Sequence, residues 1–228
     1  MSLPARVATL LVAFAAVTAG IVFVVIHYLL AGLPVEDFTS VASAGPGGVR
    51  QVSVTMQTDA QTTVTDTPDW VSYFVKNPQT GTWDHTTLLK VPAAALVKVT
   101  ILGYDGCTPL RNQVWGRVTG TVGNVEYVNG KPVSVLNSWQ ECSVQHTFAI
   151  PALGLNVPIA AVKSPNLCST SPCTSGPHTV VTFSFRTPAT PGVFVWQCRI
   201  PCAGGFLDGN GGPMSTLGYM AGELQVAS

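Results

Sequence analysis

The stretch Gly192-Val193-Phe194-Val195-Trp196-Gln197-Cys198-Arg199-Ile200-Pro201-Cys202 decides how this chain is interpreted. Its first half alternates Phe194 and Trp196 with Val193 and Val195, and a period of two residues is typical of a β-strand. Directly after this strand come two cysteines separated by three residues. The stretch therefore predicts a strand that leads into a loop with two thiols at one end of a sheet.

Further short segments of alternating apolar residues lie on both sides of this stretch, with turn residues between them. Asn129-Gly130 predicts a hairpin between residues 125–128 and 131–135, because Asn-Gly suits a type I′ turn. The other expected strands are residues 49–56, 70–75, 88–91, 96–102, 146–150, 178–186 and 222–226. Helical periodicity is absent after residue 33, apart from a short turn near residues 110–114. This pattern predicts an all-β sandwich.

The amino terminus is different, because residues 7–33 contain no Asp, Glu, Lys or Arg. As a helix this stretch would reach about 40 Å, against a membrane hydrocarbon core of about 30 Å. Arg6 and the amino terminus precede it, so the positive-inside rule places them in the cytoplasm. We therefore expect a cytoplasmic tail and single-pass transmembrane anchor in the cell membrane (1–33), a flexible linker (34–48) and an extracytoplasmic domain (49–228).

Composition narrows the function. Charged residues make up 10 % of the chain, against roughly 25 % in typical domains. The low value fits either an uncharged extracellular surface or a surface covered by another subunit. The formal net charge is zero and no basic run occurs, so nucleic acid is not expected as a partner. The sequence also lacks the nucleophile elbow, zinc-protease and phosphate-loop motifs of self-contained hydrolases.

Six cysteines in an exported protein are first considered as disulfides. Cys168 and Cys173 flank a short Ser/Pro loop and are the easiest local pair, and Cys107 and Cys142 lie at strand ends and can join two loops. Cys198 and Cys202 then remain, either as thiolates or as a third disulfide.

His146, in His146-Thr147-Phe148-Ala149-Ile150-Pro151, is the candidate partner of these two cysteines. A single histidine in a strand is more often structural than a ligand, and two nearby exported cysteines more often form a disulfide. Taken together with Met220, however, they supply imidazole, thiolate and thioether groups, which copper prefers in electron-transfer sites. His85, beside Asp84 in a loop, is expected to be solvated.

These segments resemble subunit II of cytochrome c oxidase, especially forms with one transmembrane helix, and the copper domain of nitrous oxide reductase. The matching order is His-Thr-Phe-x-Ile-Pro at 146–151, Gly-x-Phe-x-Trp-x-Cys-x-x-x-Cys at 192–202 and Met-x-Gly-x-Leu-x-Val at 220–226. The resemblance implies a cupredoxin-type Greek-key β-sandwich. It also implies a dinuclear copper site in which Cys198 and Cys202 bridge two metals, with His146, Met220 and the carbonyl of Ile200 as further ligands.

The chain departs from the family pattern at one ligand, because no histidine follows Cys202. The family places its second histidine three residues before the methionine, where this chain has Leu217, and residues 203–216 form an insertion that contains Met214. Three interpretations remain. Copper binds in an altered site through His146, Cys198, Cys202 and Met214 or Met220; the two cysteines form a disulfide in a metal-free structural subunit; or the domain delivers copper to a membrane enzyme.

The resemblance thus implies a non-catalytic, oxidase subunit II-like part of a membrane respiratory or copper enzyme. Its expected role is one-electron transfer through a modified copper site. The expected partners are the integral membrane subunits of a larger complex and a redox partner protein. An immunoglobulin-like binding module is the rival among disulfide-containing sandwiches, but it would not require two cysteines at this spacing or Met220 just before the last strand.

We predict that the mature protein keeps residues 7–33, because this apolar stretch is far longer than the 7–15-residue core of a cleaved signal peptide. Amino-terminal sequencing of the protein from its native membrane should therefore show that residues 7–33 are retained. A sequence beginning near Gly45, after the cleavage-like Ala42-Ser43-Ala44, would contradict the prediction.

Overall fold

In a computed structural model, residues 3–24, 32–64, 67–163, 168–202 and 212–228 are described. The chain divides into two compact units, residues 1–33 and residues 34–228. The first contains helix α1 (Leu3–Val24), and residues 25–31 of the expected anchor lie outside the described residues. Among the helices that can be described, none meets the length and hydropathy of a membrane-spanning helix.

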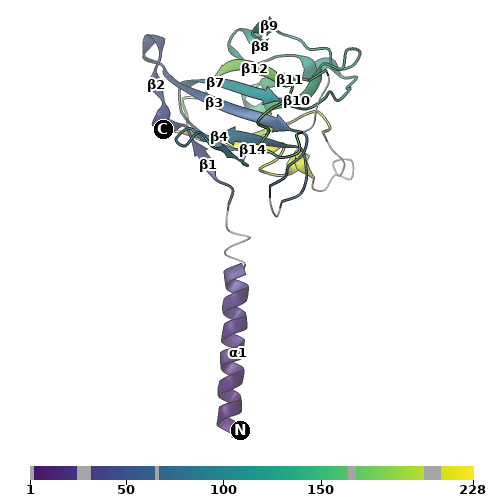
Figure 1. The fold of residues 1–228 in the computed structure, drawn as a ribbon. Helices are drawn as coiled ribbons and strands as arrows, with labels where there is room; N and C mark the ends of the chain where they lie inside the picture. The colour runs from purple at the N-terminus through teal and green to yellow at the C-terminus, as the bar shows by residue number, and fades with distance from the viewer. Residues whose placement is uncertain (1–2, 25–31, 65–66, 164–167, 203–211) are drawn as a thin grey trace. The chain divides into compact units, whose positions relative to one another are not determined.

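The second unit is a sandwich of two β-sheets (Figure 1). The strands of the six-stranded sheet are, in spatial order, β1 (Val35–Asp37), β6 (Leu88–Pro92), β14 (Ala221–Ala227), β13 (Gly192–Gln197), β10 (Val144–Ile150) and β11 (Leu155–Ala160). Those of the eight-stranded sheet are β5 (Trp83–Asp84), β4 (Ser72–Lys76), β3 (Arg50–Asp59), β7 (Ala95–Gly103), β12 (Thr179–Arg186), β8 (Glu126–Val128) and β9 (Lys131–Val133), with β2 (Ser43–Ala44) paired to β3. The prediction of a mainly β structure is confirmed.

Short 3₁₀ helices occupy several connections between the strands. Their bounds are η2 (Thr39–Val41), η3 (Pro46–Gly48), η4 (Gln113–Gly116), η5 (Val122–Asn124), η6 (Pro151–Leu153) and η8 (Pro213–Ser215). The turn expected near residues 110–114 corresponds to η4, where the Asn112 side chain accepts a hydrogen bond from the Val114 N–H. Between β8 and β9, Asn129 (φ 48°) and Gly130 (φ 79°) both have positive φ, as a type I′ turn requires.

The core lies between the two sheets and follows the alternation that the sequence shows. In β7 and β12 every second side chain is buried, and β13 contributes the fully buried Trp196. The Trp196 indole N–H donates to the Thr87 carbonyl at 3.1 Å. A Cβ at Gly222, on the neighbouring strand β14, would lie 2.4 Å from that indole nitrogen. Gly222 therefore permits the close approach between the tryptophan and the last strand.

The prediction that residues 34–48 form a flexible linker is wrong. Residues 35–37 pair in parallel with β6, and Phe38 is 1 % exposed within the core. The Asp37 carboxylate also forms a 2.8 Å ion pair with Lys90. Gly and Pro at residues 45–48 suggested flexibility, but Phe38 anchors the segment because burying an aromatic ring is strongly favourable.

Both disulfides considered from the sequence are present. Cys107–Cys142 closes a loop with a sequence separation of 35 residues, and Cys168–Cys173 closes one with a separation of 5. Cys198 and Cys202 are free. The first disulfide joins the chain that leaves β7 to the chain that enters β10, close to the histidine of interest.

Glu126 provides a test of how this interior is packed. It is fully buried in β8, neither carboxylate oxygen has a hydrogen-bond partner, and burial raises its pKa to about 9. Because the folded state holds this proton more tightly than the unfolded chain, its contribution to stability is complete below about pH 4.5 and is lost as pH rises towards 9.

We therefore predict that Glu126→Gln gains stability relative to the wild type as pH rises from 5 to about 9. Urea denaturation of both proteins at several pH values measures the difference. The exposed Glu141→Gln is the control and should show no such trend. A constant difference for Glu126→Gln would show that the carboxyl group is not buried in this way.

Candidate metal centre

Two neighbouring strands of the six-stranded sheet bring the candidate ligands together. Strands β10 and β13 are antiparallel, and their register pairs Ala149 with Gln197. His146 therefore lies on β10 three residues before Ala149, and Cys198 directly follows Gln197 at the end of β13. The sequence separates these side chains by more than fifty residues, and the sheet places them at the same end.

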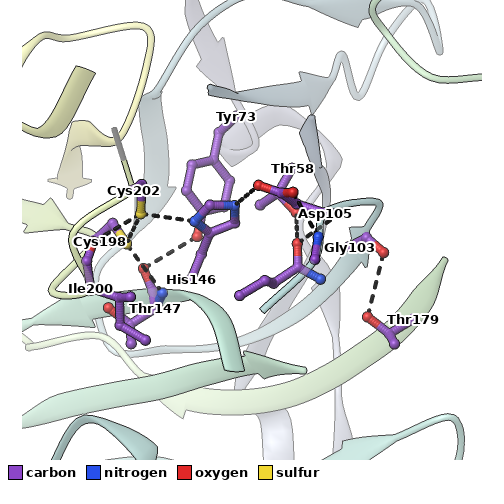
Figure 2. A network of polar contacts seen from close by, with 12 residues as sticks. Thr58, Tyr73, Gly103, Asp105, His146, Thr147, Thr179, Cys198, Ile200 and Cys202 are labelled. Atoms are coloured by element: carbon purple, nitrogen blue, oxygen red, sulfur yellow. Dashed lines mark hydrogen bonds and ion pairs between the residues drawn. The ribbon is translucent and has the colours of Figure 1, made fainter. Parts of the chain in front are cut away.

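His146, Cys198 and Cys202 form a compact cluster, with one imidazole nitrogen and both sulfurs within 4.8 Å of one another (Figure 2). The His146 Nδ1 lies 2.9 Å from the Cys202 sulfur, and the two sulfurs are 3.1 Å apart and unbonded. His146 and Cys198 are each 1 % exposed, whereas Cys202 is half-buried. Cys202 therefore forms the side of the cluster that is nearest to solvent.

The loop between the two cysteines folds back so that a backbone carbonyl faces them. The Ile200 carbonyl lies 2.8 Å from the Cys202 sulfur and 3.4 Å from the Cys198 sulfur. Thr147 holds the loop, because its N–H donates to the Cys198 sulfur at 3.4 Å and its hydroxyl accepts from the Arg199 N–H at 2.7 Å. The loop thus presents two sulfurs and one carbonyl oxygen to the histidine.

The opposite side of the imidazole faces a carboxylate. The His146 Nε2 lies 3.3 Å from the Asp105 Oδ2, an ion-pair contact that lacks hydrogen-bond geometry. Asp105 is itself positioned by Gln145, whose side-chain oxygen accepts from the Asp105 N–H at 3.2 Å and from the Thr58 hydroxyl at 2.8 Å. With Nε2 beside Asp105, Nδ1 is the nitrogen that faces the sulfurs. Histidines that bind metals commonly have a carboxylate on their second nitrogen.

Burial and charge give the two cysteines different protonation states. Burial opposes ionisation of Cys198, but hydrogen bonds from Cys202, His146 and the Thr147 N–H hold its pKa well below the usual value. Burial and the nearby Cys198 raise the pKa of Cys202 well above the usual value. For His146, burial lowers the pKa, but Asp105 and Cys198 outweigh it and raise the pKa to about 9. These shifts favour a thiolate on Cys198 beside a protonated Cys202 and a protonated His146.

The other residues expected at the site are not part of the cluster of His146, Cys198 and Cys202. Met214 and Met220 are buried in the same core cluster as Cys198, and the Cys198 N–H donates to the Met220 carbonyl at 2.8 Å. Leu217, at the sequence position where the family has its second histidine, is 42 % exposed. Residues 203–211 of the insertion lie outside the described residues.

The expectation that His85 is a solvated loop residue is wrong. Its ring packs against Phe74 and Tyr219, with centroid distances of 5.1 and 4.9 Å. Its Nε2 is buried without a hydrogen-bond partner, and burial lowers its pKa. Across the part of the chain that can be described, only His146, Cys198 and Cys202 form a cluster of three or more potential metal ligands.

Asp105 and Gln145 are the residues of this site that the sequence analysis missed. Asp105-Gly106 is a typical turn sequence, and the Gly106 N–H donates to the Asp105 carboxylate. A signal was nevertheless present, because Cys107 forms a disulfide with Cys142, four residues before His146. That disulfide brings the Asp105 turn close to the strand that carries the histidine.

No family model matches the chain, and no curated protein does. Among solved structures, it is similar to rusticyanin from Thiobacillus ferrooxidans, with 15 % identity over 78 % of this chain and 77 % of that one and a TM-score of 0.28. A histidine-to-methionine variant of rusticyanin gives 16 % identity over 86 % of each chain and a TM-score of 0.31. A third structure, described as the copper protein rusticyanin, gives 17 % identity over 78 % of each chain and a TM-score of 0.28. At such TM-scores the likeness carries no argument, and the fold rests on the strand pairing of this chain.

We predict that the metal-free, reduced protein carries one thiolate at neutral pH. The ultraviolet absorbance of thiolates, recorded during acidification, should show the loss of one such group. Cys198→Ser should remove this signal, and His146→Gln should shift its titration to higher pH because the imidazolium stabilises the thiolate. His178→Gln, which changes an exposed histidine outside the cluster, is the control. Two thiolates, or none, at pH 7 would contradict the geometry.

Proposed function

We propose that this chain is a membrane-anchored, cupredoxin-type protein that binds copper through His146, Cys198 and Cys202 and transfers single electrons within a larger membrane complex. The observation that carries the proposal is the clustering of one imidazole nitrogen and two sulfurs within 4.8 Å in a buried pocket. Two thiols and an imidazole are soft or intermediate ligands, which suit copper better than magnesium or calcium.

The arrangement of the donors supports a metal site. The Nδ1 of His146 faces the sulfurs while Nε2 faces Asp105, so the ring orientation is fixed before a metal arrives. The Ile200 carbonyl lies beside both sulfurs and offers a weak fourth ligand. This set fits one ion. The described residues provide no second histidine at the cluster, so the family's dinuclear centre is not part of the proposal.

Copper, when bound, supplies a one-electron redox change, and the protein residues control its surroundings. The Thr147 N–H donates to the Cys198 sulfur and the Thr147 hydroxyl accepts from the Arg199 N–H, and these two bonds would limit how far the ligands move between oxidation states. His146 and Cys202 must release their protons to become ligands, so metal uptake should release protons. The burial of His146 and Cys198 keeps water away from these two ligands, whereas Cys202 is only half-buried.

The membrane anchor is proposed from residues 7–33 of the sequence. In the part that the structure describes, α1 has large apolar side chains with exposed fractions between 49 % and 72 %, and they follow one another around the helix at positions 10, 11, 12 and 14. A helix that is apolar on all sides needs an apolar environment. A bilayer would provide it, with the sandwich on the extracytoplasmic side, where its two disulfides are stable. Integral membrane subunits are then the proposed partners.

Two other functions use the same residues. In a metal-free structural subunit, Cys198 and Cys202 would be joined, and their 3.1 Å separation is short enough for a disulfide to form on oxidation. In a copper-delivery protein, metal would leave past the half-buried Cys202. The unbonded sulfurs and the ordered donors around them favour a metal site that is retained.

We predict that the reduced full-length protein in neutral detergent binds one equivalent of copper and acquires visible thiolate-to-copper absorbance. Cys198→Ser and His146→Gln should each weaken binding by at least about tenfold, because ligand and supporting contacts are typically worth this much. His178→Gln should bind like the wild type, since His178 lies outside the cluster.

The outcome separates the alternatives. Metal analysis that finds no copper, together with a Cys198–Cys202 disulfide in the protein isolated from its membrane, would replace copper binding with the structural role. Binding that is lost within minutes to a competing copper chelator would favour delivery over electron transfer.

A further inference from the structure

A cationic and aromatic surface lies next to the cysteine loop. We call it the arginine–tryptophan surface and define it as Arg111, Val114, Trp115, Trp139 and Arg199. The Arg111 guanidinium lies 5.0 Å from the centre of the Trp139 ring, and that of Arg199 lies 5.9 Å from the Trp115 ring. Val114 and Trp139 are 50 % and 43 % exposed. Large apolar side chains and arginines together therefore reach the surface here.

The backbone beneath this surface is held in place. The Leu110 N–H donates to the Ser138 carbonyl at 2.7 Å, and the Ser138 hydroxyl donates back to the Leu110 carbonyl at 3.0 Å. The Leu136 N–H donates to the Gly116 carbonyl at 2.8 Å. The Cys107–Cys142 disulfide closes the base of the same two segments. A partner would therefore meet an ordered surface, so little conformational entropy would be lost on binding.

The two guanidinium groups have no acidic partner in the described part of the chain, where the ion pairs are Lys90–Asp37 and His146–Asp105. The Arg199 Nε is buried and therefore out of reach of a partner, so Arg199 would bind a carboxylate through its terminal nitrogens. A guanidinium stacked on a tryptophan keeps its N–H edge free to bind a carboxylate through two parallel hydrogen bonds. Arginine and tryptophan are also the residues enriched at the centres of protein interfaces.

The position of this surface connects it to the candidate metal centre. Arg199 follows Cys198 directly, and its N–H donates to Thr147, which also donates to the Cys198 sulfur. Cys202, the half-buried edge of the cluster, belongs to the same loop. A protein that bound Arg199 would therefore contact the loop that carries both cysteines.

We propose that the arginine–tryptophan surface docks a partner protein through a carboxylate-rich segment. Charge complementarity selects this occupant, because the free charges of the surface are guanidiniums while the whole chain has a formal net charge of zero. An anionic membrane is a poorer fit, since lipid-binding patches typically combine about 4–8 basic residues. That the docked partner is a redox protein rests on the proposed function. The binding of a carboxylate-rich segment does not require metal.

The test uses the full-length, reduced and metal-free protein in neutral detergent, with ¹⁵N-labelled tryptophan. The indole signals are assigned through tryptophan-to-phenylalanine variants, and a polyglutamate peptide is the probe. Added peptide should shift the Trp115 and Trp139 signals and leave those of Trp70, Trp83 and Trp196 unchanged. Polylysine should shift none of them, and about 0.5 M salt should reverse the effect of polyglutamate, because exposed charges are then screened.

Arg111→Gln and Arg199→Gln should each weaken peptide binding by up to about fivefold, the upper range for an exposed charge pair. Lys76→Gln is the matched control, because Lys76 lies 5.9 Å from the Trp83 ring in another cation–aromatic pair. It should bind the peptide like the wild type. The Arg111→Lys variant keeps the positive charge. If it binds the peptide more weakly than the wild type, the guanidinium group itself is needed.

Unchanged Trp115 and Trp139 signals, or an equal loss in Lys76→Gln, would overturn the proposal. Shifts caused by phosphatidylserine vesicles but not by polyglutamate would also overturn it and assign the surface to a membrane. Since no metal is present in this experiment, a protein that fails to bind copper can still bind the peptide, and the two proposals fail separately.

Discussion

The candidate centre depends on one constraint, which is that a histidine buried at 1 % exposure must have partners for both ring nitrogens. His146 has the Cys202 sulfur beside Nδ1 and the Asp105 carboxylate beside Nε2, the second as an ion-pair contact without hydrogen-bond geometry. Each partner is then held in turn, Asp105 by Gln145 and the cysteine loop by Thr147. Because the three polar residues Gln145, His146 and Thr147 are consecutive on β10, a single buried strand organises both sides of the site.

The same strand explains why the site lies where it does in the sandwich. All seven residues of β10 are buried, although three of them are polar. An ordinary core strand would not contain them, because burying unpaired polar groups is costly. Here the Gln145 amide donates to the Ala160 carbonyl, and the Thr147 carbonyl accepts from the Tyr73 hydroxyl. The polar groups are thus used to connect the ends of neighbouring strands from both sheets.

Much of this could be predicted from the sequence, and the limits are physical. Strands such as residues 192–197 were found because alternation directly encodes which side chains face the core, and the Asn129-Gly130 turn was found because its backbone conformation suits those residues. Strand β11 was missed although Leu155, Val157 and Ile159 alternate with other residues, because Pro158 lies inside the run and a proline argues against a strand. Phe38 and Asp105 were missed for another reason: each acts through a contact distant in sequence, which local patterns do not contain.

The two cysteines differ in burial and in pKa. The loop that carries them also joins the candidate metal centre to the arginine–tryptophan surface. Cys198 is buried, receives the Thr147 N–H and has a lowered pKa, whereas Cys202 is half-buried and keeps its proton. An ion bound by both sulfurs would therefore have to displace a proton from Cys202. Arg199 lies between the two cysteines in the sequence, and its guanidinium lies over Trp115 on the surface proposed to dock a partner. If copper and a carboxylate both bind as proposed, the carboxylate would lower the positive potential beside the thiolate, and docking would change the redox potential of the copper through this one loop.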